Sequence, residues 1–126
     1  MMENCIFCKI IEKKIPSHII DEDDKLIVLL SLENHPLIVP KSHITDIFSL
    51  DNEIGALIMK KAIKIAKATK DGLNCDGIYL AQANGKAAGQ DVFHYHLHLY
   101  PKWNNKEENH LAEKKEILVS KIKAKL

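Results

Sequence analysis

Short runs of apolar residues along the chain predict five β-strands. The runs lie at residues 18–20, 25–32, 36–40, 77–83 and 92–101. The second run reads KLIVLLSL and the third PLIVP, and the tight connection Glu33-Asn34 between them favours a hairpin. Proline bounds the third run on both sides, which is typical of strand ends because proline cannot donate to a sheet ladder.

Longer periodic segments predict helices. Residues 5–14 form a short helix that Pro16 ends. A second helix starts after a cap at Asp51 or Ser49 and ends at about residue 70. Its apolar positions share one face, with lysines opposite, which indicates a solvated lysine face rather than a nucleic-acid patch. The apolar positions are Ile54, Leu57, Ile58, Ala62, Ile65 and Ala66, and the lysines are Lys60, Lys64 and Lys67.

The C-terminal residues predict a third helix from Glu107 to the end of the chain. Asn105 and Glu108 have the spacing of a capping box. A narrow apolar stripe predicts a surface helix docked on the body of the protein or on a partner chain: Leu111, Leu118, Ile122 and Leu126. The fold class that follows is α+β, an antiparallel sheet of about five strands with one long helix packed on it, plus a C-terminal helix.

Composition limits the classes of partner. A chain of 126 residues fits one domain with a core, and its net charge of +1 gives no footprint for long nucleic acid or an acidic membrane. A small anionic ligand needs only a local site. No apolar run approaches the roughly 18 residues of a membrane span, and the N-terminus shows no secretory signal. The three cysteines are an odd number, which favours a reducing cytoplasm over a disulfide framework.

Three of the seven histidines alternate with apolar residues on the predicted strand 92–101. His94, His96 and His98 therefore share one face, roughly 6.5–7 Å from one to the next, and the residues between them face the core. A polar sheet surface is the plain alternative. Histidines at this density usually bind metal or perform acid–base and nucleophilic chemistry, so this strand is the first candidate site.

The pattern His-φ-His-φ-His-φ-φ, in which φ is apolar, resembles the histidine triad (HIT) family. Further segments resemble the family's in the same order, over about residues 3–103: CIFCKII at 5–11, IPS at 15–17, LIVPKSH at 37–43 and NGKAAGQDV at 84–92. The joint pattern is far more specific than any one piece. It implies a HIT-like domain over residues 1–104 with a C-terminal helical extension at 105–126, and a homodimer whose sheets join across the two-fold axis.

The resemblance implies that His96 attacks the α-phosphorus of a small nucleotide and forms a nucleotidyl-histidine, which water then cleaves. Neutral imidazole is a good nucleophile near pH 7. His98 would donate to the phosphate oxygens, and His35 would assist the nucleophile. Glycine lets the backbone N–H groups of the preceding loop approach the phosphate. The implied nucleotide contacts are Asn84, Gly89, Gln90, Asp91, Val92 and Ser31.

A second candidate site is a metal centre. Cys5-x-x-Cys8 offers two thiolates at a spacing that suits zinc. The resemblance implies that His43 and His94 complete a structural Zn²⁺ site, which would tie the N-terminal helix to the histidine strand. A reduced thiol pair without metal and a redox Cys-x-x-Cys are the alternatives. No thioredoxin-like βαβ pattern surrounds the pair, which makes the redox alternative weak. Cys75 stands alone and is expected to be a small buried residue.

Some positions depart from the family pattern. Ser31 stands where most members have an acidic residue that holds ribose hydroxyls, and the loop before His35 is about four residues shorter. Asp91 stands where Ser or Thr is frequent, and a carboxylate there repels phosphate unless it is protonated. Lys102 replaces a frequent arginine, which keeps the charge without the bidentate contact.

These observations predict a cytoplasmic enzyme of the HIT type that hydrolyses a nucleoside phosphoramidate or a related small nucleotide, or transfers its nucleotidyl group, at the α-phosphate. A dinucleoside polyphosphate hydrolase, which needs room for a second nucleoside, is one alternative. A nucleotide- or zinc-binding module with little turnover is the other, and the departures at Ser31 and in the loop before His35 favour it.

Overall fold

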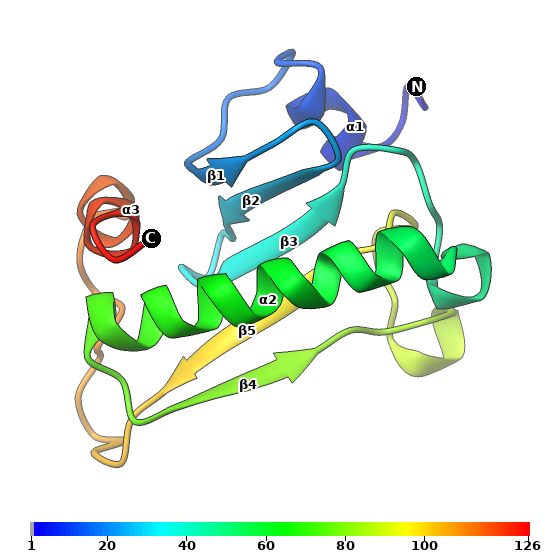
Figure 1. Ribbon diagram of the computed structural model, residues 1–126. Helices are drawn as coiled ribbons and strands as arrows, with labels where there is room; N and C mark the ends of the chain where they lie inside the picture. Colours follow the sequence, from blue (N-terminus) through cyan, green and yellow to red (C-terminus); the bar gives the residue numbers. More distant parts are fainter. Residues whose placement is uncertain (1) are drawn as a thin grey trace.

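Five strands form one antiparallel sheet in the computed structural model, which describes residues 2–126 (Figure 1). The order in the sheet is β1-β2-β3-β5-β4. The predicted α+β class and the number of strands are therefore confirmed. The bounds are β1 (Ile19–Glu22), β2 (Leu26–Leu30), β3 (Pro36–Pro40), β4 (Gly77–Ala81) and β5 (Leu97–Lys102).

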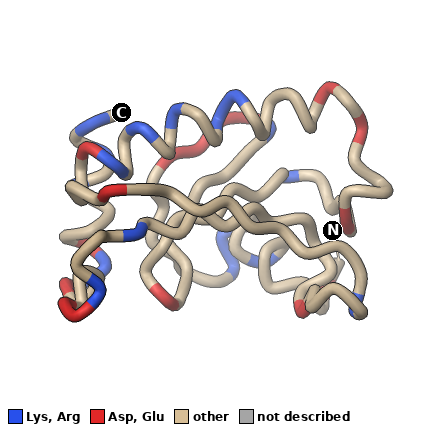
Figure 2. The backbone as a smooth tube through the Cα atoms, turned by 90° about the horizontal axis from the view of Figure 1, so that it is seen from below, with Lys and Arg blue, Asp and Glu red and all other residues tan. Residues whose placement is uncertain are grey.

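The long helix α2 (Asn52–Leu73) crosses one face of the sheet. The Asp51 carboxylate caps it by accepting the Ile54 N–H at 2.8 Å, as the sequence predicted. The helix runs three residues further than expected and stops at Asn74, whose φ of +54° takes the left-handed conformation of a helix C-cap. Figure 2 shows lysines recurring along its outer side, and its buried residues pack on the sheet.

The opposite face of the sheet carries the short helix α1 (Ile6–Ile11). Phe7 and Ile10 pack there against apolar side chains of β2 and β3, which form a second small core. Every residue of β2 and β3 is consequently buried, because one set of alternate side chains faces α2 and the other faces α1. Two single-turn 3₁₀ helices, Ile47–Ser49 and Lys86–Ala88, lie in the connections.

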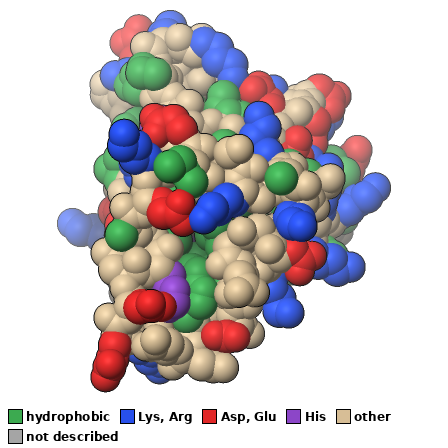
Figure 3. All heavy atoms as spheres, turned by 90° about the vertical axis from the view of Figure 1, so that its left-hand side faces the viewer, with side chains coloured by type: hydrophobic (Ala, Val, Ile, Leu, Met, Phe, Trp, Pro, Cys, Tyr) green, Lys and Arg blue, Asp and Glu red, His purple; other side chains and the backbone are tan. Residues whose placement is uncertain are grey.

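The C-terminal helix is shorter than predicted. The helix α3 spans Lys115–Lys123, and the proposed start at Glu107 is wrong, because Asn105 accepts the Glu107 N–H in a local turn and does not cap a helix. Leu118 and Ile122 are fully buried in the core that α2 covers. A Cβ on Gly72 would lie 2.4 Å from the carbonyl oxygen of Lys121, so glycine allows α2 and α3 to approach this closely. On the outer surface of this end, Figure 3 shows basic and acidic side chains interspersed.

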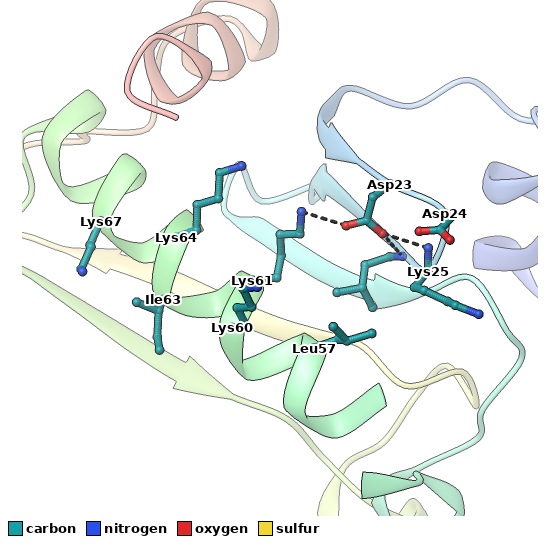
Figure 4. Close-up of a pocket in the computed structure, with 10 residues that line it drawn as sticks. Asp23, Asp24, Lys25, Leu57, Lys60, Lys61, Ile63, Lys64 and Lys67 are labelled. Carbon is teal, nitrogen blue, oxygen red and sulfur yellow. Dashed lines mark hydrogen bonds and ion pairs between the residues drawn. The ribbon is translucent and has the colours of Figure 1, made fainter. Parts of the chain in front are cut away.

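The acidic turn between β1 and β2 anchors α2. The Lys61 ammonium lies 2.7 Å from Asp21 and 3.0 Å from Asp23, and its side chain is only 13% exposed. Figure 4 shows Lys61 reaching across a hollow of about 610 Å³ between helix and turn, away from the histidine strand. The turn is therefore an anchor as well as a solvated loop. Among the helices of residues 2–126, none combines the length and apolar composition that a bilayer span requires.

Candidate active site and metal centre

The three alternating histidines lie on the face of β5 that is opposite α2. Regular strand pairing begins only at Leu97, so the predicted strand is wrong for residues 92–96. There the backbone N–H of Tyr95 donates instead to the Ile44 carbonyl at 2.6 Å. The alternation still holds, because Tyr95, Leu97 and Leu99 are buried in the core under α2. The histidines therefore point away from that core.

His96 presents a free ring nitrogen. Its Nδ1 lies 2.7 Å from the His94 carbonyl oxygen, which only accepts, so Nδ1 carries the proton and Nε2 carries the lone pair. The side chain is 9% exposed. The nearest carboxylate oxygen, Asp91 Oδ1, lies 3.9 Å from Nε2. This arrangement suits a nucleophile that approaches an electrophile from a fixed direction.

A hydrogen-bond chain assigns the proton positions on the other two histidines. The Ser31 hydroxyl oxygen accepts the N–H groups of Glu33 and His35, so its own proton donates to His35 Nδ1 at 3.0 Å. His35 Nε2–H then donates to His98 Nδ1 at 2.9 Å. The proton of neutral His98 is therefore on Nε2, where it can donate to a phosphate oxygen.

Burial keeps these two imidazoles neutral. Desolvation lowers the pKa of His35 to about 4, and repulsion from Lys102, from Lys115 and from His98 when it is protonated acts in the same direction. Desolvation also lowers the pKa of His98, and electrostatic repulsion from His96 is the second cause of the decrease. Both rings are uncharged at neutral pH, as the hydrogen-bond chain requires.

The low pKa of His35 predicts a loss of stability in acid. Between pH 6.5 and about 4 the unfolded chain binds a proton on His35 that the folded chain does not, so the free energy of unfolding falls as the pH drops. The slope is at most about 1.4 kcal/mol per pH unit. Denaturant unfolding at pH 7.5 and pH 5 should show a smaller acid loss for His35→Gln than for the wild type. Equal losses of stability in the two proteins would show that His35 does not contribute to the pH dependence of unfolding. The other titrating groups are present in both proteins, so their contributions to the loss of stability cancel in the comparison.

The loop before the histidine strand is held by its own side chains. Gly85 and Gly89 have φ values of +90° and +92°, a conformation that favours glycine. The Gln90 side chain is buried, accepts the Gly85 N–H and donates to the carbonyls of Thr45 and Val92. Asn84 accepts the Ile47 N–H at 2.7 Å. Gln90 and Asn84 thus shape the loop. The N–H groups of Gly89 and Val92 are also engaged, since they donate to the Lys86 carbonyl and the Asp91 carboxylate.

A lysine outside the predicted domain holds the loop that carries Ser31. The three N–H donors of the Lys115 ammonium reach the carbonyl oxygens of Ser31 and Leu32, at 2.9 and 3.1 Å, and the side-chain oxygen of Asn34. The Asn34 amide in turn donates to the Leu111 carbonyl at 2.9 Å. Sequence reasoning missed Lys115, because no local motif relates it to a loop about 80 residues earlier.

Four predicted metal ligands come together beside the histidine strand. The ligand atoms of Cys5, Cys8, His43 and His94 all lie within 4.8 Å of one another. Cys5 Sγ lies 3.2 Å from His94 Nδ1, and Cys8 Sγ lies 3.2 Å from His43 Nδ1. Tetrahedral zinc with these donors has ligand separations of roughly 3.3–3.8 Å. The geometry therefore fits a four-coordinate ion.

The surroundings of the cluster also fit a metal. His94 Nε2–H donates to the Pro40 carbonyl at 2.7 Å, which leaves the Nδ1 lone pair free to coordinate. Burial lowers the pKa of His94 to about 4, so the ring is neutral. Burial raises the pKa of Cys8, and a bound cation would reverse this by deprotonating the thiol. Cys75 is buried apart from the cluster, as predicted.

Comparisons with known proteins agree on one family. The family model for the HIT domain matches residues 12–105. Protein hit of Bacillus subtilis is 38% identical over 105 residues, which are 80% of this chain and 72% of that protein. The adenosine 5′-monophosphoramidase of Saccharomyces cerevisiae is 37% identical over 106 residues, 81% of this chain and 65% of that enzyme. A Zn-bound histidine triad family protein from Mycobacterium smegmatis has a TM-score of 0.87 and 32% identity, and covers 96% of this chain and 91% of its own.

The fold and the site define a small α+β domain with a Cys/His cluster beside a strand of alternating histidines. The chain belongs to the HIT domain family. The family assignment made from the sequence is confirmed.

Proposed function

We propose that the protein hydrolyses nucleoside phosphoramidates or related small nucleotides at the α-phosphate. The observation that carries the proposal is the set of fixed imidazoles, with a lone pair on His96 Nε2 and a donor on His98 Nε2. A nucleophile beside a donor is what attack at an anionic phosphorus requires. The adenosine 5′-monophosphoramidase among the relatives supports the same chemistry.

The proposed reaction has two steps. His96 Nε2 forms a bond to the α-phosphorus while the P–N bond of the substrate breaks, and the amine leaves with the electron pair and takes up a proton. Water then attacks the same phosphorus, the bond to His96 breaks, and the nucleoside monophosphate is released. His98 Nε2–H and the backbone N–H of Asp91 stabilise the charge on the phosphate oxygens, whereas the N–H groups of the other three residues of 89–92 donate within the loop. His35 and Ser31 orient His98.

We further propose that the four-residue cluster holds zinc as a structural ion. The donor set is two thiolates and two imidazoles, without a position left for water, which is typical of a structural site. Bound there, zinc would join the N-terminal helix to the histidine strand, because Cys5 and Cys8 lie at α1 and His94 lies two residues before His96. The Zn-bound family member supports this assignment.

Release of AMP from adenosine 5′-phosphoramidate tests the proposal. Purified, zinc-loaded protein is expected to produce AMP and ammonia in equal amounts. The assay is followed by chromatography of the nucleotide and by a coupled ammonia assay. A folded, zinc-loaded protein that binds AMP and releases no product would instead identify a binding module, the alternative that the short loop before His35 favours.

Asp91 is expected to protonate the leaving amine. Its carboxyl group lies 3.9 Å from His96 Nε2, beside the position of the reacting phosphorus and its leaving group. Asp91→Ala should slow release of AMP from adenosine phosphoramidate about 10²-fold. The same variant should hydrolyse the nitrophenyl ester of AMP at nearly the wild-type rate, because that leaving group needs no proton. Unchanged turnover of the phosphoramidate would refute the role, as would equal losses for both substrates.

We also propose the homodimer that the family resemblance implies. β4 pairs only with β5, so its other edge has open backbone donors and acceptors in the described structure. Leu80 on this strand is 41% exposed, and Met59 and Ile63 on α2 are each 51% exposed. Sedimentation velocity should show a dimer that Leu80→Lys weakens, and a monomeric wild type at micromolar concentration would contradict it.

A further inference from the structure

A row of aromatic rings leads from the candidate nucleophile to the surface. The His96 ring meets His98 edge-on at 5.0 Å between centroids, and His98 stacks on Tyr100 at 5.3 Å and 10°. Tyr100 stacks on Tyr79 of the neighbouring strand at 5.8 Å and 27°. These residues share one face of the sheet, because Tyr79 and Tyr100 are direct partners across β4 and β5.

The row ends in an open hollow. Tyr100 is enclosed, since His35 also lies 4.1 Å from it, whereas Tyr79 is 59% exposed. Tyr79 lines a hollow of about 680 Å³, which is within the usual size of small-molecule sites. Its other walls include Lys102, Trp103, Lys106, His110 and Leu111. Trp103 stacks on His110 at 4.2 Å and 10°, so a second flat aromatic pair borders the same space.

We propose that this hollow is a subsite for the leaving group of the substrate, and that it selects leaving groups that carry a planar aromatic ring on a tether. The inference rests on the proposed function, because His96 sets where the bond breaks. Three features carry it: a bare tyrosine face, its place in a stack that begins at the reacting histidine, and the tryptophan–histidine pair in the wall. A flat ring gains from stacking on such faces, and a saturated ring of similar size does not.

Two sources could supply such a ring. One is an arylalkyl amine joined through the P–N bond, and the other is a second nucleoside joined through a polyphosphate. Lys102 and Lys106 outnumber the single carboxylate of the lining, Glu108, and this excess positive charge matters only for the second source. Lys106→Gln should therefore weaken only the polyphosphate compound if that source is used.

The test compares two adenosine phosphoramidates, one with a phenylbutyl amine and one with a cyclohexylbutyl amine. The rings are remote from nitrogen, so the amines are equally good leaving groups. The saturated ring is the more hydrophobic, so a preference for phenyl isolates stacking. The wild type should prefer the phenyl compound by about 5-fold in kcat/KM, and Tyr79→Leu should bring the ratio close to 1. Ile117→Ser on α3, where the side chain is similarly exposed and does not line the hollow, is the control and should keep the preference. The second arm of the test compares kcat/KM for a dinucleoside triphosphate, which carries a second nucleoside, with kcat/KM for a nucleoside triphosphate, which does not.

A binding measurement separates this inference from the proposed reaction. Trp103 is the single tryptophan and lines the hollow, so its fluorescence reports occupancy. In His96→Ala protein, which is expected not to turn over, the phenyl compound should bind about 5-fold more tightly than the saturated one. This ratio would stand even if the wild type released no product. Equal affinities for the two rings, or a preference that survives Tyr79→Leu, would overturn the subsite.

Discussion

Replacement of His96 by alanine is expected to abolish release of AMP from adenosine phosphoramidate, with a fall in kcat on the order of 10³-fold or more. The reason is that His96 Nδ1–H donates to the His94 carbonyl, which leaves the lone pair of the ring on Nε2. His98 has its proton on Nε2 and its Nδ1 engaged, so it cannot take over the attack. The measurement is steady-state turnover at pH 7 with protein of matched zinc content.

His18→Ala is the matched control for this substitution, because His18 is partly exposed and lies outside the site. Wild type quenched with denaturant at alkaline pH, where a P–N bond to histidine survives, should carry a nucleotidyl group detectable by mass spectrometry, and His96→Ala should not. Turnover above a tenth of the wild-type rate in a folded His96→Ala protein would rule out the nucleophile. A nucleotidyl adduct on another residue would also rule out His96 as the nucleophile.

Loss of the metal is expected to have the largest effect on stability. Cys8→Ser should lower the zinc content below one ion per chain and lower the Tm by on the order of 10 °C, because the proposed ion would join α1 to the histidine strand. Chelator should give the same shift in the wild type. The measurements are elemental analysis of tag-free protein and thermal unfolding followed by circular dichroism.

Cys75→Ala is the control, since Cys75 is also buried but lies apart from the cluster. It should keep the zinc and lose only the small free energy of a truncated side chain. Protein that contains no zinc, with a Tm that chelator leaves unchanged, would contradict the metal site. The prediction is independent of catalysis, because it does not involve His96.

Most of the fold follows from the periodicity of the sequence. The runs at β2 and β3 and the amphipathic pattern of α2 specify elements that the structure contains within a few residues. The histidine strand is the exception. Alternation predicts strand from residue 92, but Tyr95 pairs with Ile44, which lies in the connection between β3 and α2. Such a partner depends on how the chain returns in space, which a local pattern does not encode.

The C-terminal segment illustrates the same limit. Residues before 115 have polar and apolar spacing that suits a helix, yet Leu111 accepts a hydrogen bond from Asn34, and His110 stacks on Trp103. These tertiary contacts outweigh helix propensity, which is weak in a short polar segment. The clustering of Cys5, Cys8, His43 and His94, by contrast, was predictable, because the family resemblance supplies the four residues that the structure brings together.

The candidate site shows where a residue type alone is insufficient. Asn84 and Gln90 were predicted as nucleotide contacts, and the structure uses their side chains to hold the loop. Ser31 was considered for the ribose, and its hydroxyl orients His35. Their direct contact with a nucleotide stays a prediction. A hydroxyl or amide has several possible partners, and only the folded geometry selects one.

The contact of Lys115 with the loop of Ser31 has a consequence for local motion. An opening that lifts α3 from the sheet must also release the carbonyls of Ser31 and Leu32, and would leave His35 without its oriented hydroxyl. The backbone amides of α3 and of residues 31–35 are then expected to exchange with solvent deuterium as one cooperative unit. Fraying of the last helix would thus change the orientation of His35 and His98, although α3 supplies no atom to either ring.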